Sequence, residues 1–134
     1  MERSTFLEYV ACNTDMQALS SSLADTTITL GKNTARGLGA GGVPAVGRAS
    51  AIDSSAEIEA LVNGVDMVFV TAGMGGGTGS GAAPVVAELA KTAGCSCGNY
   101  CEHRGLLCEV CHYVTQPLVE LYEGCMVVLK VSWC

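Results

Sequence analysis

Apolar and polar residues follow one another in blocks that predict an open α/β sheet. Phe6–Cys12 is short and apolar and runs into the polar trio Asn13–Asp15, while Val65–Ala72 is almost continuously apolar. We interpret both as buried strands, because a parallel strand that is covered on both faces lacks polar alternation. Ile28–Gly31 predicts a weaker strand or a turn.

Helical spacing of apolar residues appears in two longer segments. Pro44–Asn63 predicts one helix that begins with proline, a residue suited to a first helical turn, and Ala82–Ala93 predicts a second helix. Met16–Ser22 predicts one or two helical turns. Strands that alternate with helices are typical of a parallel sheet, in which ligands bind outside the carboxyl ends of the strands.

A glycine-rich segment, Gly73–Gly81, lies between the second apolar strand and the last helix. Six of its nine residues are glycine, so few Cβ atoms shield the backbone amides from phosphate oxygens. The following helix presents free amides and the positive end of its dipole, both of which favour an anion. The segment therefore predicts a phosphate-binding loop. A second glycine-rich segment, Gly37–Pro44, precedes the first long helix.

Common nucleotide motifs fit this chain poorly. The only Gly-Lys pair, Gly31-Lys32, lacks the remaining residues of a Walker A loop, which disfavours a P-loop enzyme. The spacing Gly37-x-Gly39-x-x-Gly42 matches the dinucleotide pattern, but no convincing strand precedes it. Gly77-x-Gly79-x-x-Ala82 follows a strand, but no second strand with a ribose-binding acid follows. A Rossmann dinucleotide-binding site stays a minor alternative.

The segment Gly75–Gly81 resembles the signature of the tubulin/FtsZ family. Flanking residues from about Tyr9 to Gly94 resemble FtsZ, the bacterial and plastid division GTPase, more closely than eukaryotic tubulin. The resemblance is carried by Asn13–Leu19, Arg36–Gly41, Pro44–Arg48 and Asp66–Val86.

The resemblance implies a partial Rossmann-like parallel sheet of the tubulin/FtsZ GTPase domain, incomplete at both ends, that binds GTP with Mg²⁺. The α- and β-phosphates would lie on the signature loop, Gly75–Gly81, and the γ-phosphate on the second glycine-rich loop, Gly37–Pro44. Mg²⁺ would lie near the polar loop Asn13–Asp15. By the same resemblance, the ligand-binding residues would be Gly75, Gly76, Gly77, Thr78 and Gly79; Ala40, Gly41 and Gly42; and Asn13 and Asp15.

Structural roles are the alternative for these residues. Asn13 and Asp15 have side chains suited to capping the helical turn that begins at Met16. The glycines of residues 39–42 would serve equally well for tight packing between helix and strand.

Other parts of the FtsZ site have no counterpart in these residues. The family has an earlier glycine-rich phosphate loop, residues that bind the ribose and the purine, and an acidic loop that completes the site of the next subunit. We therefore predict no catalytic or metal-ligating residue and expect the isolated chain not to hydrolyse GTP. In the family, head-to-tail assembly into filaments brings this acidic loop of one subunit to the nucleotide site of the next. A non-catalytic module that caps such filaments is an alternative function.

Cysteine usage divides the chain at Gly94, since seven of the eight cysteines follow it. We predict a partial FtsZ-like GTP-binding domain over 1–94 and a Cys-rich tail over 95–134. We interpret this tail as translated intron or frameshifted sequence without a fold of its own. A zinc-binding product is the alternative, because soft ligands gather within a short stretch. These ligands are Cys95, Cys97, Cys101, Cys108, Cys111 and His112.

The charge and the hydropathy of the chain limit the classes of molecule that it is expected to bind. A net charge of −6 with only seven Lys and Arg disfavours nucleic acid, whose backbone attracts clusters of cations. No apolar run is long enough to insert into a membrane, although the mean hydropathy of +0.38 is high for a soluble domain.

A retained intron in the region after Gly94 would indicate a nuclear gene. FtsZ of nuclear origin mostly serves plastids, so we expect the plastid stroma (chloroplast), with the cytoplasm as the alternative.

Overall fold

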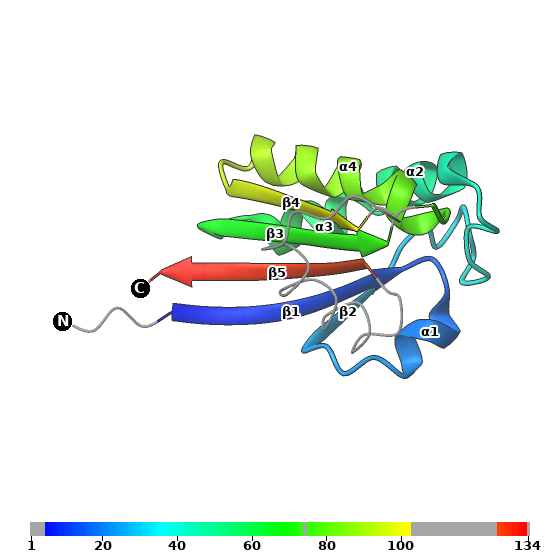
Figure 1. The fold of residues 1–134 in the computed structure, drawn as a ribbon, viewed down its shortest axis with the longest axis horizontal. Helices are drawn as coiled ribbons and strands as arrows, with labels where there is room; N and C mark the ends of the chain where they lie inside the picture. The colour runs from blue at the N-terminus through cyan, green and yellow to red at the C-terminus, as the bar shows by residue number, and fades with distance from the viewer. Residues whose placement is uncertain (1–4, 74, 103–125, 134) are drawn as a thin grey trace.

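The computed structural model describes residues 5–73, 75–102 and 126–133, which form one five-stranded sheet with four helices (Figure 1). The strands lie in the order β2-β1-β5-β3-β4. In chain order the elements are β1 (Thr5–Asn13), α1 (Met16–Ser20), β2 (Thr26–Thr29), α2 (Pro44–Asp53), α3 (Ser55–Val62), β3 (Met67–Gly73), α4 (Thr78–Thr92), β4 (Ser96–Glu102) and β5 (Met126–Trp133).

The strands before residue 94, which are β1, β2 and β3, all take part in parallel pairs. β1 pairs in parallel with β2, and β3 pairs in parallel with β4. Between these two pairs lies β5, which runs antiparallel to both β1 and β3. Figure 1 shows β5 pointing the opposite way to β3. The α/β fold is thus confirmed, with one central antiparallel strand that the sequence analysis did not predict.

Two strands of the sheet come from the region after Gly94. β4 and β5 pair with β3 along its two edges, so these parts of the Cys-rich region belong to the same sheet as the preceding residues. Residues 103–125, between the two strands, lie outside the described part of the chain. A separate origin for the region after Gly94 stays a prediction.

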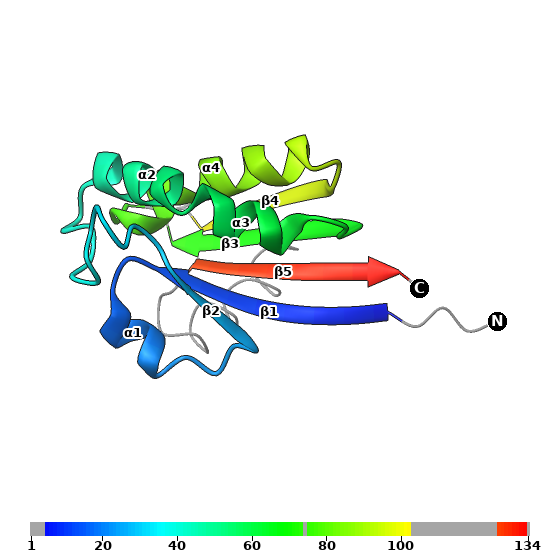
Figure 2. The same ribbon diagram turned by 180° about the vertical axis from the view of Figure 1, so that it is seen from behind.

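Helices cover the two faces of the sheet unequally. α2, α3 and α4 lie on one face, and α1 lies on the other (Figures 1 and 2). Along β1, Val10 and Cys12 join the main core with α2–α4, whereas Ala11 packs with Leu19 of α1. This alternation follows from the two-residue period of a strand. It places the larger core under the three helices.

The single helix predicted over 44–63 is wrong, because the chain breaks it at Ser54 into α2 and α3. Ser54 has φ −100° and ψ 15°, outside the helical region, and its buried hydroxyl accepts a hydrogen bond from the amide of Gly31 at 2.9 Å. That long-range bond anchors the break to the segment just after β2, which ends at Thr29. Hydrophobic spacing carries no sign of such a contact.

α4 begins at Thr78, four residues before the predicted Ala82. Glycines disfavour a helix by about 1 kcal/mol each, which hid its first turn in the sequence. Ala82, Val86 and Ala90 recur every four residues and are buried in the main core. Among the described residues, no helix is long and apolar enough to cross a membrane.

Candidate functional site

Three loops gather at the edge of the sheet where β1 and β3 end. They are the polar loop Asn13–Asp15, the second glycine-rich loop around residues 37–43, and the signature loop before α4. Figures 1 and 2 show α1 and the first turns of α2 and α4 at this same end. The sheet therefore brings together the three segments in which the sequence analysis placed ligand-binding residues.

Backbone hydrogen bonds join the polar loop to the second glycine-rich loop. The amide of Gly39 donates to the carbonyl of Thr14 at 3.1 Å, and the amide of Met16 donates to the carbonyl of Gly37 at 3.2 Å. Asp15 and Leu38 form an isolated antiparallel bridge. These contacts join the two loops beside the end of β1.

Side chains join the polar loop to the signature loop. The hydroxyls of Thr14 and Thr78 lie 2.7 Å apart, although 64 positions separate them in the chain. Thr78 also donates a longer hydrogen bond, 3.5 Å, to the side-chain oxygen of Asn13. Because Thr78 is the first residue of α4, these bonds fix the start of that helix against the end of β1.

Some glycines of the site are required by packing. A Cβ on Gly77 would lie 2.7 Å from the Cβ of Ala40 and 2.8 Å from the amide of Val43, so the two glycine-rich loops touch there. A Cβ on Gly79 would collide with the carbonyl oxygen of Gly73. Close packing therefore accounts for Gly77 and Gly79, where a side chain would force the loops apart. At the glycines of residues 39–42, for which packing was the alternative, a Cβ would meet Asp15 at 3.9 Å beside Gly39 and no atom within 4 Å beside Gly41 or Gly42.

Other glycines line open space. A Cβ on Gly41, Gly42, Gly75 or Gly76 would meet no atom within 4 Å, and all four residues are exposed. Gly41, Gly42 and Gly75 have positive φ of 61°, 73° and 99°, which other residues rarely adopt. The space beside these glycines is open to a ligand at the point where α2 and α4 begin.

Helix α4 starts without a side-chain cap. Gly77 is its N-cap residue and makes no side-chain hydrogen bond to the first turn. The first turn of a helix has amides without intrahelical partners, and its dipole attracts negative charge. Nearby, the amide of Gly75 donates to the hydroxyl of Ser80 at 3.0 Å, which holds the loop against the helix.

Asn13 and Asp15 make local hydrogen bonds that shape the polar loop. The Asn13 side-chain oxygen accepts from the amides of Thr14 at 2.8 Å and Asp15 at 3.3 Å. Asp15 is the N-cap of α1, and its Oδ1 accepts from the amide of Gln17 at 2.9 Å. Asp15 thus has the capping role that the sequence analysis gave as the alternative. Its other carboxylate oxygen, Oδ2, takes no part in the cap.

All ten predicted ligand-binding residues lie in these three loops or at the start of α4. They differ in what they offer: open backbone at four glycines, packing at Ala40, Gly77 and Gly79, and side-chain oxygens at Asn13, Asp15 and Thr78. Sequence reasoning passed over Thr14, which is completely buried and joins all three loops. The sequence feature that could have identified Thr14 is its position between Asn13 and Asp15, both of which were predicted to bind the ligand.

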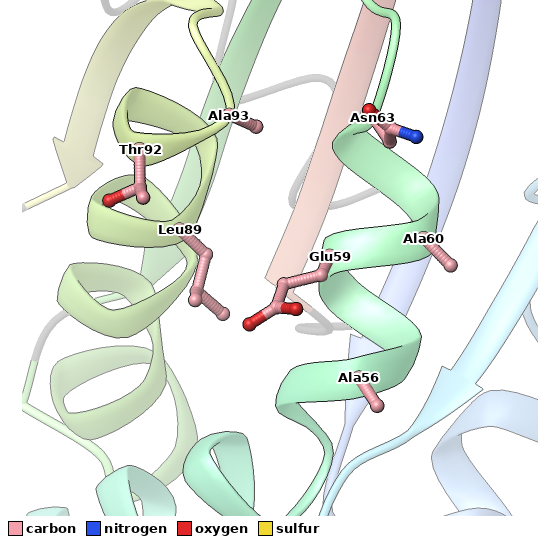
Figure 3. A pocket seen from close by; sticks show the side chains of 7 residues that line it. All are labelled: Ala56, Glu59, Ala60, Asn63, Leu89, Thr92 and Ala93. Atoms are coloured by element: carbon pink, nitrogen blue, oxygen red, sulfur yellow. The ribbon is translucent and has the colours of Figure 1, made fainter.

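A groove of about 410 Å³ lies elsewhere, between α3 and the C-terminal half of α4 (Figure 3). Glu59 and Leu89 point toward one another across it from the two helices. The groove lies near the opposite end of α4 from Thr78, about 20 Å along the helix. It is separate from the edge where the loops meet. Its lining is Ala56, Glu59, Ala60, Asn63, Leu89, Thr92 and Ala93.

The zinc alternative receives no support from the part of the chain that the structure describes, where no three His, Cys, Asp or Glu residues form a metal-binding group. Cys95 is buried, and its thiol donates to the carbonyl of Val62 at 3.1 Å. Cys108, Cys111 and His112 lie outside the described residues.

Comparison with known proteins assigns the family. The model of the GTPase domain of the tubulin/FtsZ family matches residues 2–101. The chain therefore belongs to the tubulin/FtsZ family, as the signature loop and its flanking residues indicated.

Solved structures with similar folds include two of FtsZ from M. jannaschii. An empty FtsZ dimer is 53% identical over 64% of this chain and 25% of its own, with a TM-score of 0.63. A point mutant of that FtsZ is 42% identical over 86% of this chain and 35% of its own, with a TM-score of 0.68.

A third similar structure is a protofilament of CetZ2 from Haloferax volcanii with GTPγS bound. It is 33% identical over 69% of this chain and 29% of its own, with a TM-score of 0.61. The chain thus spans about a third or less of the length of these three proteins.

Proposed function

We propose that this chain of the tubulin/FtsZ family binds the phosphates of GTP at the edge where its two glycine-rich loops meet. The observation that carries the proposal is the open space beside Gly41, Gly42, Gly75 and Gly76 at the uncapped start of α4. A helix N-terminus next to exposed amides is a favourable environment for an anion. The GTPγS that the CetZ2 structure contains supports the same ligand class.

Mg²⁺ would accompany the phosphates near Asn13 and Asp15. Mg²⁺ prefers oxygen ligands and usually keeps several waters, which carboxylate and amide oxygens can order. The donor set fits this chemistry, because Oδ2 of Asp15 takes no part in the cap of α1. Bound Mg²⁺ would neutralise part of the phosphate charge.

The test is titration of the chain with GTP, measured calorimetrically with and without Mg²⁺. Gly76→Val should weaken binding at least about tenfold, because it fills open space in the loop without meeting protein atoms. Ala60→Val, on the exposed face of α3, is the matched control and should bind like the wild type. Equal binding by the wild type and Gly76→Val would contradict the proposed site.

We also propose that copies of the chain associate through this edge. Exposed apolar side chains surround the loops: Leu38 is 87% exposed, Met16 60% and Val43 47%. Large exposed apolar side chains that gather in one region are typical of interaction surfaces. The dimer and the protofilament among the similar structures support self-association, and a head-to-tail arrangement would place this edge between subunits.

Sedimentation velocity tests the association. Leu38→Ser should reduce the oligomer fraction in the presence of GTP. Leu23→Ser is the matched control, because Leu23 is 74% exposed and lies between α1 and β2, outside the three loops. An equal effect of both variants would indicate general hydrophobic aggregation instead of a defined interface.

Hydrolysis, division and cellular location stay predictions from the resemblance. We expect no GTP turnover by the isolated chain. Turnover that is abolished by Thr78→Ala together with Gly77→Val would refute this expectation.

A filament-capping role would appear as reduced polymer when the chain is added to a full-length FtsZ. A plastid location would place peptides of residues 95–134 in purified stroma by mass spectrometry, and their recovery from cytoplasm alone would exclude it.

A further inference from the structure

We propose that Thr14 is a positioning residue that holds the Thr78 hydroxyl ready to donate to a phosphate oxygen. The inference rests on the proposed function and adds a residue that the signature does not contain. Thr14 is completely buried, so its own hydroxyl has no access to a ligand. It acts on the ligand only through the residue that it contacts.

The hydrogen-bond directions follow from the three side chains. The Asn13 oxygen is an acceptor only, so in their 3.5 Å contact the Thr78 hydroxyl is the donor. The two threonine oxygens lie 2.7 Å apart and either could donate; because the Thr78 proton is used toward Asn13, we assign the proton of this bond to Thr14. The chain of donors therefore runs from Thr14 to Thr78 and then outward.

The outer bond is the weak one. At 3.5 Å the Thr78–Asn13 contact is at the limit of a hydrogen bond, and the Asn13 oxygen already accepts from two backbone amides. A phosphate oxygen carries negative charge and is a stronger acceptor than a neutral amide. A phosphate at the start of α4 would therefore take the Thr78 proton, while the short Thr14 bond keeps the Thr78 oxygen in place.

The backbone of Thr14 extends the same arrangement to the second glycine-rich loop. Its carbonyl accepts from the amide of Gly39 at 3.1 Å, and its amide donates to the side chain of Asn13 at 2.8 Å. Substitution of the side chain leaves both groups present. The hydroxyl can thus be removed while the loop contacts stay.

The test compares Thr14→Val with Thr14→Ser by calorimetric titration with GTP and with inorganic triphosphate. Thr14→Val should weaken both ligands by about three- to tenfold, the change expected for one hydrogen bond, and Thr14→Ser should restore binding. Thr71→Val is the matched control, because Thr71 is a buried threonine on β3 whose hydroxyl donates to the carbonyl of Val127. It should affect stability without changing affinity.

The outcomes separate the two proposals. No binding of either ligand by the wild-type chain would overturn the proposed function and this inference together. The inference alone would be overturned if the wild type binds and Thr14→Val has unchanged affinity, or if Thr14→Val and Thr14→Ser lose affinity equally.

A second measurement uses only the wild type, so it does not depend on how a variant folds. By NMR, the Thr14 hydroxyl proton should keep its contact with Thr78 when GTP is added, and loss of that contact would contradict the inference.

Discussion

Lys130 of β5 donates a hydrogen bond to Glu8 of β1 across the sheet, with 2.8 Å between Nζ and Oε2. The two residues are 122 positions apart and are direct partners in the register of the two strands. The Lys130 side chain is only 18% exposed. The end of the Cys-rich region and the beginning of the described chain thus share one ion pair.

This ion pair predicts a dependence of stability on pH. Lys130 and the Thr26 hydroxyl donate to the carboxylate, and both lower the pKa of Glu8 below its ordinary value of 4.5. The contribution is therefore present above that value and is lost as the pH falls through the lower folded value. Glu8→Gln should destabilise the chain by about 0.5–1 kcal/mol at pH 7 and by less at pH 3, measured by urea unfolding.

The exposed pair Lys32–Glu57 is the control for that experiment. Its side chains are 62% and 44% exposed, so Glu57→Gln should change stability by less than about 0.5 kcal/mol at either pH. Equal changes in the free energy of unfolding for the two substitutions would mean that the Glu8–Lys130 pair stabilises the chain no more than an exposed ion pair does.

Val128 tests whether β5 is part of the core. It is completely buried, and the register places it between Val10 of β1 and Val70 of β3. Val128→Ala should cost about 1–3 kcal/mol in the free energy of unfolding, because it leaves a cavity at the centre of the sheet. Leu7→Ala, at a site that is 54% exposed on β1, should cost less than about 1 kcal/mol. An unaltered unfolding curve for Val128→Ala would exclude β5 from the folded core.

Gly81 tests the packing between α2 and α4. Within a helix, alanine is favoured over glycine by about 1 kcal/mol. Here, however, a Cβ on Gly81 would collide with the carbonyl oxygen of Pro44 and approach the amide of Arg48 at 2.6 Å. Gly81→Ala should therefore destabilise by about 1–3 kcal/mol despite its higher helix propensity. Gly76→Ala, in open space, should change stability by at most about 1 kcal/mol. Stabilisation by Gly81→Ala in urea unfolding would disprove the close contact.

Asp15 allows its capping role and its ligand role to be measured separately. Asp15→Ala removes the cap of α1 and should cost about 0.5–2 kcal/mol, whereas Asp15→Asn keeps an acceptor and should cost less. If Asp15 also orders Mg²⁺, Asp15→Asn should reduce the gain in GTP affinity that Mg²⁺ provides. Thermal unfolding and calorimetric titration with and without Mg²⁺ give the two quantities. An Asp15→Asn variant that matches the wild type in both would leave capping as the role of this residue.

Cys95 should react slowly with alkylating reagents. Burial raises the pKa of its thiol, and the negative charge of Asp66 raises it further, so little thiolate is present at pH 8. Iodoacetamide labelling, followed by peptide mass spectrometry, should be much slower in the native chain than in urea and should increase with pH. Equal rates in the native and unfolded chain would show that the thiol is accessible.

Local sequence was sufficient for the elements whose signals are short-range. The apolar runs before Asn13 and before the signature loop became β1 and β3, and proline at position 44 marked the start of α2. Membership of the tubulin/FtsZ family also followed from contiguous residues, since the glycine signature and its flanking segments occur in one stretch. These features depend on backbone conformation and on residue spacing along the chain.

Tertiary structure alone decided the features that depend on contacts between distant residues. Met126–Trp133 is apolar enough to form a strand, but its place between β1 and β3 depends on pairing with residues more than fifty positions away. The break at Ser54 depends on the amide of Gly31, and the role proposed for Thr14 depends on its contact with Thr78. Sequence by itself determined the family and predicted a phosphate-binding loop, because both depend on residues that are contiguous in the chain. Only folding decided which hydroxyls, loops and strands meet, because hydrogen bonds and close packing act through space.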